Sequence, residues 1–199
     1  MIKILSTLIS ILSLTFAVHA ATPPNQKWIL DLEKSSGTVE FKAIGRPSAL
    51  KINGKGDKAK GALNIEGLNL TGTASFALDS LDTGIKLRNE HMKKKYLETD
   101  KYPEAKFTFT KVILPESLNA ENASVDMLPF EGKLLLHGME KPVSGLAKIE
   151  RKGAEVSVAA NFGLKISDYG IPAPGFAGIT MAEDVDVQVQ FSGPYTKAQ

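Results

Sequence analysis

The fold is decided by residues 80–110, SLDTGIKLRNEHMKKKYLETDKYPEAKFTFT, because only here does an otherwise alternating strand pattern break off. Asp82-Thr83-Gly84 supplies turn residues. Asn89 is predicted to be the N-cap of a short helix, since its side chain can accept from an unpaired backbone N–H one turn later. Lys93-Lys94-Lys95 then falls near the negative end of that helix, where cations are favourable. The stretch therefore predicts one short helix between two strands.

The chain on both sides of this stretch is typical of β-structure. Pro103 excludes helix, so a strand is predicted from about Ala105. Residues 70–78, 156–162 and 185–191 alternate between apolar and polar positions, as strands with one buried face do. About eight to ten strands with frequent turn signals fit a closed antiparallel barrel or a sandwich, and the pattern alone does not choose between them.

The N-terminus has the features of an export signal. Lys3 is basic, Ile4–Val18 is a fifteen-residue apolar run, and Val18-His19-Ala20 is a small-residue cleavage site. The run is shorter than the roughly 20 residues of a membrane span. We expect cleavage after Ala20, no stable membrane insertion, and a single domain over residues 21–199.

Composition excludes several classes of function. The whole chain carries a formal charge of +2, and removing Lys3 with the signal leaves +1. A nucleic-acid binder would show a clear basic excess, so no nucleic-acid partner is expected. The chain contains no cysteine, which rules out disulfides, thiolate ligands and a cysteine nucleophile.

Catalytic and metal-binding motifs are missing from the sequence. Once His19 leaves with the signal, His91 and His137 are the remaining histidines, and two scattered histidines are a weak basis for a zinc site. There is no H-E-x-x-H, G-x-S-x-G or phosphate-binding loop. We expect no catalytic residue, no metal site and no cofactor, although a small lipid-acting hydrolase or isomerase stays open as an alternative. His137 is expected in a hairpin turn, bonded to backbone there.

Aromatic residues recur at inward positions of the predicted strands: Phe41, Phe76, Phe107, Phe109, Phe130, Phe162 and Phe191, with Trp28 near one end. They could fill the interior, because side chains alone can fill an eight-stranded barrel. They could instead line an apolar channel. Alternation by itself favours the filled interior.

Several short motifs carry a resemblance to a known family. They are Leu81-Asp82-Thr83-Gly84, Arg88-Asn89-Glu90-His91-Met92, Tyr102-Pro103 and Phe107, supported by Trp28-Ile29-Leu30-Asp31, Leu136-His137-Gly138, Lys141-Pro142-Val143 and Asp168-Tyr169-Gly170-Ile171. In this order, over most of residues 21–199, the chain resembles the YceI-like family of small exported bacterial proteins. Members of that family have a lipocalin-like antiparallel barrel that holds a polyisoprenoid chain.

The resemblance implies a closed barrel of about eight strands with one short α-helix, in a periplasmic binding protein that is not an enzyme. The phenylalanines and Trp28 would then line a channel, and Arg88, His91 and Tyr96 would close or rim it. The alternative for these three is a capping salt bridge and a packed helix face.

The implied ligand is an isoprenoid lipid or isoprenoid quinone, with no other cofactor, and a homodimer is left open. The rival function is an envelope stress or interaction protein with a filled barrel. Two segments depart from the family pattern, residues 41–47 and the proline- and glycine-rich residues 170–178. We expect both at a barrel end.

Overall fold

The computed structural model describes residues 27–197 apart from 32–35, 47–50, 58 and 177–178. The predicted signal peptide, residues 1–20, and its cleavage site after Ala20 lie outside the described residues. Within the described part, no helix combines the length and apolar character that crossing a membrane demands.

Strands make up most of the described chain. They are β1 (Lys27–Asp31), β2 (Ser36–Arg46), β3 (Lys51–Gly56), β4 (Ala59–Glu66), β5 (Asn69–Ala77), β6 (Glu104–Lys111), β7 (Asn122–Leu136), β8 (Met139–Lys152), β9 (Glu155–Lys165), β10 (Gly175–Phe176) and β11 (Ile179–Lys197). The helical elements are η2 (Leu78–Ser80), α1 (Lys86–His91), the π-helical turn η3 (Met92–Tyr96), η4 (Glu116–Asn119) and η5 (Ile166–Tyr169). The prediction of a mainly β chain with one short α-helix is confirmed.

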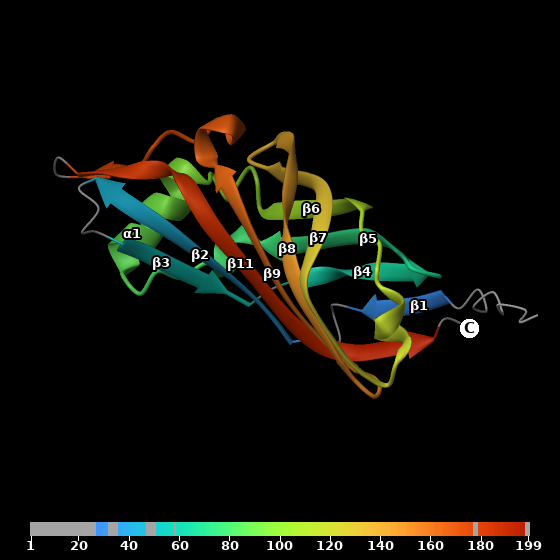
Figure 1. Ribbon diagram of the computed structural model, residues 1–199. Coiled ribbons are helices and arrows are strands. Elements are labelled where there is room, and N and C mark those ends of the chain that lie inside the picture. Colours follow the sequence, from blue (N-terminus) through green and yellow to red (C-terminus); the bar gives the residue numbers. More distant parts are fainter. Residues whose placement is uncertain (1–26, 32–35, 47–50, 58, 177–178, 198–199) are drawn as a thin grey trace, which may run out of the picture.

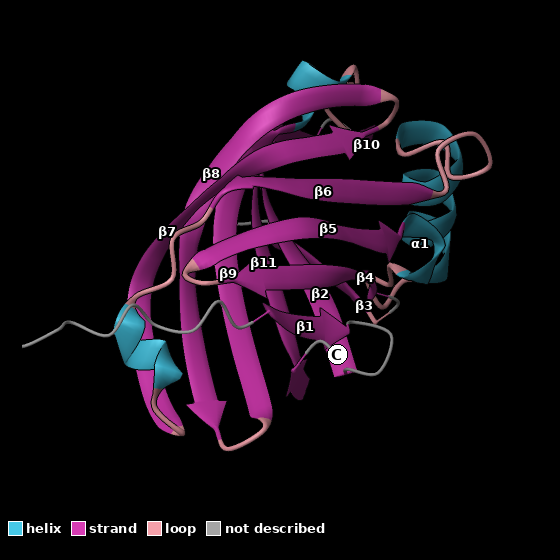
Figure 2. Cartoon of the chain, turned by 90° about the vertical axis from the view of Figure 1, so that its right-hand side faces the viewer, coloured by secondary structure: helices cyan, strands magenta, loops and turns pink. Residues whose placement is uncertain are grey.

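All eleven strands belong to one antiparallel sheet in the order β1-β4-β5-β6-β7-β8-β9-β11-β2-β3, with β10 paired to β11. Figures 1 and 2 show this sheet curling around a concave inner face, with α1 across one end. The short strand β1 pairs with β4 along its whole length, and its residues 28–30 also pair with residues 195–197 at the end of β11. The wall of the molecule is thus one curled sheet, which excludes the sandwich of two stacked sheets.

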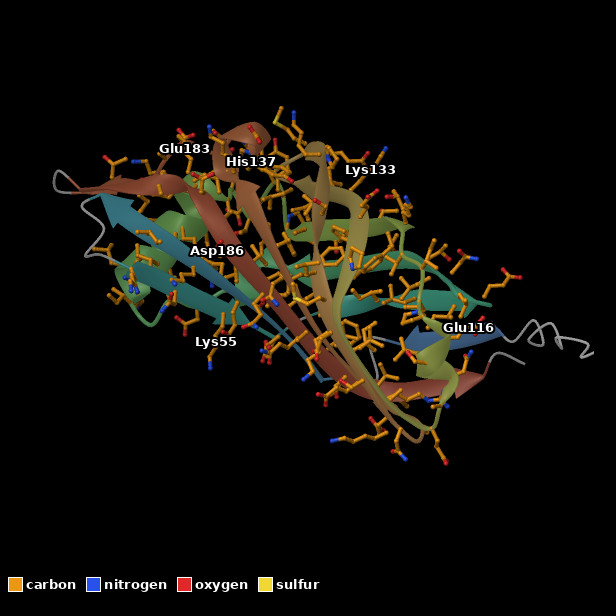
Figure 3. The ribbon with its side chains drawn as sticks, viewed as in Figure 1. Lys55, Glu116, Lys133, His137, Glu183 and Asp186 are labelled. Atoms are coloured by element: carbon orange, nitrogen blue, oxygen red, sulfur yellow. The ribbon has the colours of Figure 1, made fainter. Side chains whose placement is uncertain are left out.

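Residue alternation decides which face of each strand is inward. In β7, Leu128, Phe130, Gly132, Leu134 and Leu136 are buried, while the alternate residues 129, 131, 133 and 135 are exposed to solvent. Figure 3 shows charged side chains such as Lys133 projecting from the outside of the ribbon. Burying each large apolar side chain contributes roughly 1.5–3 kcal/mol, so the inward rows supply much of the energy that holds the curl.

The central helix begins earlier than the sequence predicted. Its first residue is Lys86, with Ile85 at the N-cap, so the assignment of Asn89 as N-cap was wrong. The Asn89 Oδ1 accepts from the backbone N–H and the hydroxyl of Thr83, at 2.8 and 2.6 Å, and its Nδ2 donates to Asp82 at 2.6 Å. Asn89 therefore ties the helix to the preceding loop, because that loop folds back along the helix.

Candidate functional site

A cavity of about 630 Å³ lies inside the concave face of the sheet. Its size is within the range of small-molecule binding sites, about 300–1,000 Å³. Lining side chains come from α1 and η3 at one end and from η4 and the start of β9 at the other. Figures 1 and 2 show α1 and η4 at opposite ends of the sheet, so the cavity runs along the molecule.

Seven of the eight predicted lining residues border this cavity: Phe41, Phe76, Phe107, Phe109, Phe130, Phe162 and Phe191. The eighth, Trp28, belongs to β1 and pairs with Ile65, but its side chain lies outside the described residues. Four of the rings form a connected group. The ring centroids of Phe107 lie 4.8 Å from Phe109 and 5.8 Å from Phe130, both edge-on. Phe130 and Phe162 are perpendicular at 6.3 Å. Such edge-to-face pairs are favourable beyond the area they bury.

Glycines on neighbouring strands explain why these rings leave the interior hollow. A Cβ on Gly132 would lie 2.3 Å from Cζ of Phe107, and a Cβ on Gly145 would lie 2.6 Å from Cζ of Phe130. A Cβ on Gly54 would likewise lie 2.3 Å from Cε1 of Phe41. Each ring edge thus occupies the space where a neighbouring side chain would begin. The rings lie against the wall of the sheet and leave the middle open.

The cavity reaches the surface beside α1. Among its described lining residues, those classed as exposed are Ile85, Leu87, His91 and Gly175. Ile85 is 52% exposed and Leu87 is 54% exposed, unusually high values for large apolar side chains on a cavity wall. The hydroxyl of Tyr96 accepts from the backbone N–H of Gly175 at 3.3 Å, which links η3 to β10 across this opening. These residues define the mouth of the cavity.

The three predicted rim residues all border the cavity at this end. Arg88 is half-buried and donates from Nε to the hydroxyl of Thr83 at 2.9 Å and from a terminal nitrogen to the carbonyl of Thr83 at 2.6 Å. These bonds to neutral acceptors fix α1 on the loop before it. Part of the divergent segment 170–178 is also at the mouth, through Gly175, as expected.

The far end contains a charged residue that the sequence reasoning missed. Arg151 borders the cavity near η4 and donates to the carbonyls of Gly153, Leu118 and Asn119, at 3.0 to 3.2 Å. It follows Val143, Gly145, Ala147 and Ile149 on the same face of β8, at every second residue. This alternation was the signal that could have placed it inside. Its bonds hold η4 over the end of the cavity.

His137 does not border the cavity. It lies in the turn between β7 and β8, as predicted, but its ring bonds elsewhere: Nδ1 to the Tyr169 carbonyl and Nε2 to the Glu98 carboxylate, both at 3.0 Å. Figure 3 shows it beside η5. Lys101 and His137 hold the pKa of the Glu98 carboxyl below its usual value. The ring therefore joins three segments and has a structural role.

Other chemistry is sparse in the described residues. They contain no group of three His, Cys, Asp or Glu side chains placed to hold a metal ion. His91, at the mouth, and His137, in the β7–β8 turn, belong to different elements and do not form a pair. Burial raises the pKa of Tyr169 to about 12, so this phenol stays neutral inside the core cluster that also contains Ile171.

Comparison with solved structures shows the same fold. A polyisoprenoid-binding domain from Saccharophagus degradans, implicated in plant cell wall breakdown, aligns with a TM-score of 0.63 over 81% of this chain and 98% of that one, at 17% identity. BcnA of Burkholderia cenocepacia aligns with a TM-score of 0.62 over 82% and 99%, also at 17% identity. At this identity the likeness concerns the fold.

Sequence relatives are bacterial proteins named UPF0312. One from Pseudomonas savastanoi pv. phaseolicola is 31% identical over 168 residues, which is 81% of this chain and 70% of the relative. Another, from Pseudomonas putida, is 33% identical over 99 residues, and this match spans about half the length of either protein. The profile of the YceI-like domain matches residues 28–192, which contain nearly the whole sheet and the cavity. The chain belongs to the YceI-like family.

Proposed function

We propose that this protein binds a long apolar lipid, a polyisoprenoid or an isoprenoid quinone, with its tail in the cavity and its head group at the mouth. The observation that carries the proposal is an elongated cavity of about 630 Å³, walled by apolar side chains and open beside α1. The solved domain from Saccharophagus degradans, described as polyisoprenoid-binding, supports the same ligand class.

The proposal includes a closed barrel around the lipid. The support is that β1 pairs with β4 on one side and with the end of β11 on the other, so hydrogen bonding continues across the join. A closed wall suits an apolar tail, because it excludes water along the length of the lipid.

We further propose that the protein is exported to the periplasm and there stores or transfers its lipid, without catalysing a reaction. The apolar run and small-residue site near Ala20 support export. The intact mass of protein from a periplasmic extract should correspond to a chain that starts at Ala21. A full-length species in the membrane fraction would contradict cleavage.

The affinity for an isoprenoid should depend on the length of its tail. Each buried methylene contributes roughly 0.8 kcal/mol, so a five-carbon isoprene unit gains about 3 kcal/mol before the tail is ordered. Ordering and imperfect contact offset most of this, which leaves about 1 kcal/mol, or about five-fold in affinity, per unit. Affinity across isoprenoids with one shared head group should rise and then level off when the cavity is full. A flat series would refute binding of the tail.

A pair of substitutions, one that fills the cavity and one outside it, tests where the tail binds. Ala160 lines the cavity from β9, whereas Ala159 is its neighbour on the opposite face of the strand. Ala160→Phe should weaken binding about tenfold or more by filling space that the tail needs. Ala159→Phe adds the same volume outside and should bind normally. Equal effects would mean that the ligand does not occupy the cavity.

The lipid content of the native protein tests the rival functions. Native mass spectrometry of protein purified from its own host should reveal a bound lipid, and an empty protein would favour an interaction module. If an activity on lipid were found and the joint replacement of His91 and His137 abolished it without loss of binding, the enzyme alternative would be supported instead.

A further inference from the structure

The mouth of the cavity coincides with the most basic segment of the described chain. Residues 85–97 contain five basic residues and one acidic residue, a formal charge of +4. The whole chain carries only +2, so the remaining residues together carry −2. Positive charge is therefore concentrated on the one helical segment that borders the opening.

Apolar and basic side chains share the outer surface of this segment. Ile85 and Leu87 are more than half exposed, and Lys86 and Lys94 are also exposed. Leu87 and His91, four residues apart, occupy one helix face, and Lys94 follows one turn later. Lys93 uses its ammonium to bond the Asp79 carbonyl at 2.6 Å, which anchors the helix. Exposed leucine and isoleucine beside lysines are typical of helices that lie on lipid head groups.

We propose that α1 and η3 dock on an anionic lipid bilayer and place the cavity mouth against it. Lysines would bind the phosphate-bearing head groups, and Ile85 and Leu87 would enter the boundary of the acyl chains. Because both apolar residues also line the cavity, docking would join the membrane interior to the cavity wall by a continuous apolar path. A long tail could then pass between them without crossing water. This role in loading rests on the proposed lipid binding, whereas docking itself does not.

Co-sedimentation with vesicles tests the docking. Vesicles of phosphatidylcholine with about 30% phosphatidylglycerol should retain the protein, whereas pure phosphatidylcholine should retain far less. Binding should weaken at about 0.5 M salt, where exposed charges are screened. Each lysine near an anionic surface is worth about five-fold, so Lys86→Glu combined with Lys94→Glu should lower the affinity at least about 25-fold. Neither lysine borders the cavity.

Two controls match these changes. Lys106→Glu with Lys111→Glu makes the same change in net charge on β6, where both side chains are exposed, and should bind vesicles normally. Leu87→Gln should weaken binding, whereas Met127→Gln, at a position 68% exposed on β7, should not. The proposal would be overturned if wild-type protein did not bind anionic vesicles. It would also be overturned if the β6 control lost as much affinity as the Lys86/Lys94 variant.

Lipid content separates this proposal from the proposed function. The Lys86/Lys94 variant, loaded with an isoprenoid from detergent, should hold it as tightly as wild type while failing to take it from vesicles. Loading from vesicles at the wild-type rate would refute the loading role. Absence of lipid from both proteins, with vesicle binding intact, would refute the proposed function and leave docking standing.

Discussion

The phenylalanine rings should lie against the wall of the sheet only because glycines face them. Gly132→Ala is the sharpest test. A Cβ at this position on β7 would lie 2.3 Å from Cζ of Phe107 and 2.5 Å from the carbonyl oxygen of Thr108. The ring can swing away into the cavity. The carbonyl belongs to the paired strand β6 and can move only if the two strands separate.

Overpacking of this kind usually costs about 1–3 kcal/mol, and we expect about 2 kcal/mol here because one of the two close contacts is with backbone. For a chain of this size, that loss lowers the melting temperature by about 4–8 °C. A ring pushed inward also narrows the cavity. We therefore expect isoprenoid affinity to fall about tenfold alongside the loss of stability.

Gly163→Ala on β9 is the matched control. A Cβ there meets nothing within 4 Å, and the residue is exposed. Its unfolding free energy should stay within about 0.5 kcal/mol of wild type, and binding should be unchanged. Urea unfolding and ligand titration of both variants measure the difference. If Gly132→Ala behaved like Gly163→Ala, the explanation of the hollow interior by facing glycines would be wrong.

Three further outcomes follow from the site and its surroundings. Arg88→Ala removes both hydrogen bonds to the loop before α1 and should lower the free energy of unfolding by about 1 kcal/mol. Lipid release, measured by stopped-flow exchange, should become several-fold faster. Lower stability with unchanged release would mean that Arg88 has only a structural role. Lys101 and His137 depress the pKa of Glu98, so the stability that its carboxylate contributes is present at neutral pH, declines below about the ordinary value of 4.5, and is gone only below the depressed value. Glu98→Gln should therefore melt below wild type at pH 7 and match it only in acid below that depressed value. Burial raises the pKa of Tyr169 from 10.0 to about 12, so the unfolded chain ionises at a lower pH than the folded one. Wild type should therefore lose stability as the pH rises from about 10 to about 12, whereas Tyr169→Phe should lack this loss when both are unfolded in urea over that range. The same pH dependence of stability in both proteins would contradict the prediction.

Local sequence patterns predicted the elements of this protein well. Alternating residues identified β5, β9 and β11 and their inward phenylalanines, because a strand turns successive side chains to opposite faces. The break in that pattern at residues 80–110 located the helix. The N-cap was misplaced by about one turn, because Asn89 bonds to Thr83 in a loop whose path depends on tertiary packing.

Only the tertiary structure decided whether the interior was filled or hollow. The sequence shows seven inward phenylalanines, but not that Phe107 lies over Gly132, twenty-five residues later, or Phe130 over Gly145. These relations arise from the register between strands. The partners of His137, thirty-two and thirty-nine residues away, depend likewise on the assembled fold. Alternation within one strand is a property of neighbouring residues, whereas a cavity is the space left when many distant strands pair, and no single segment encodes it.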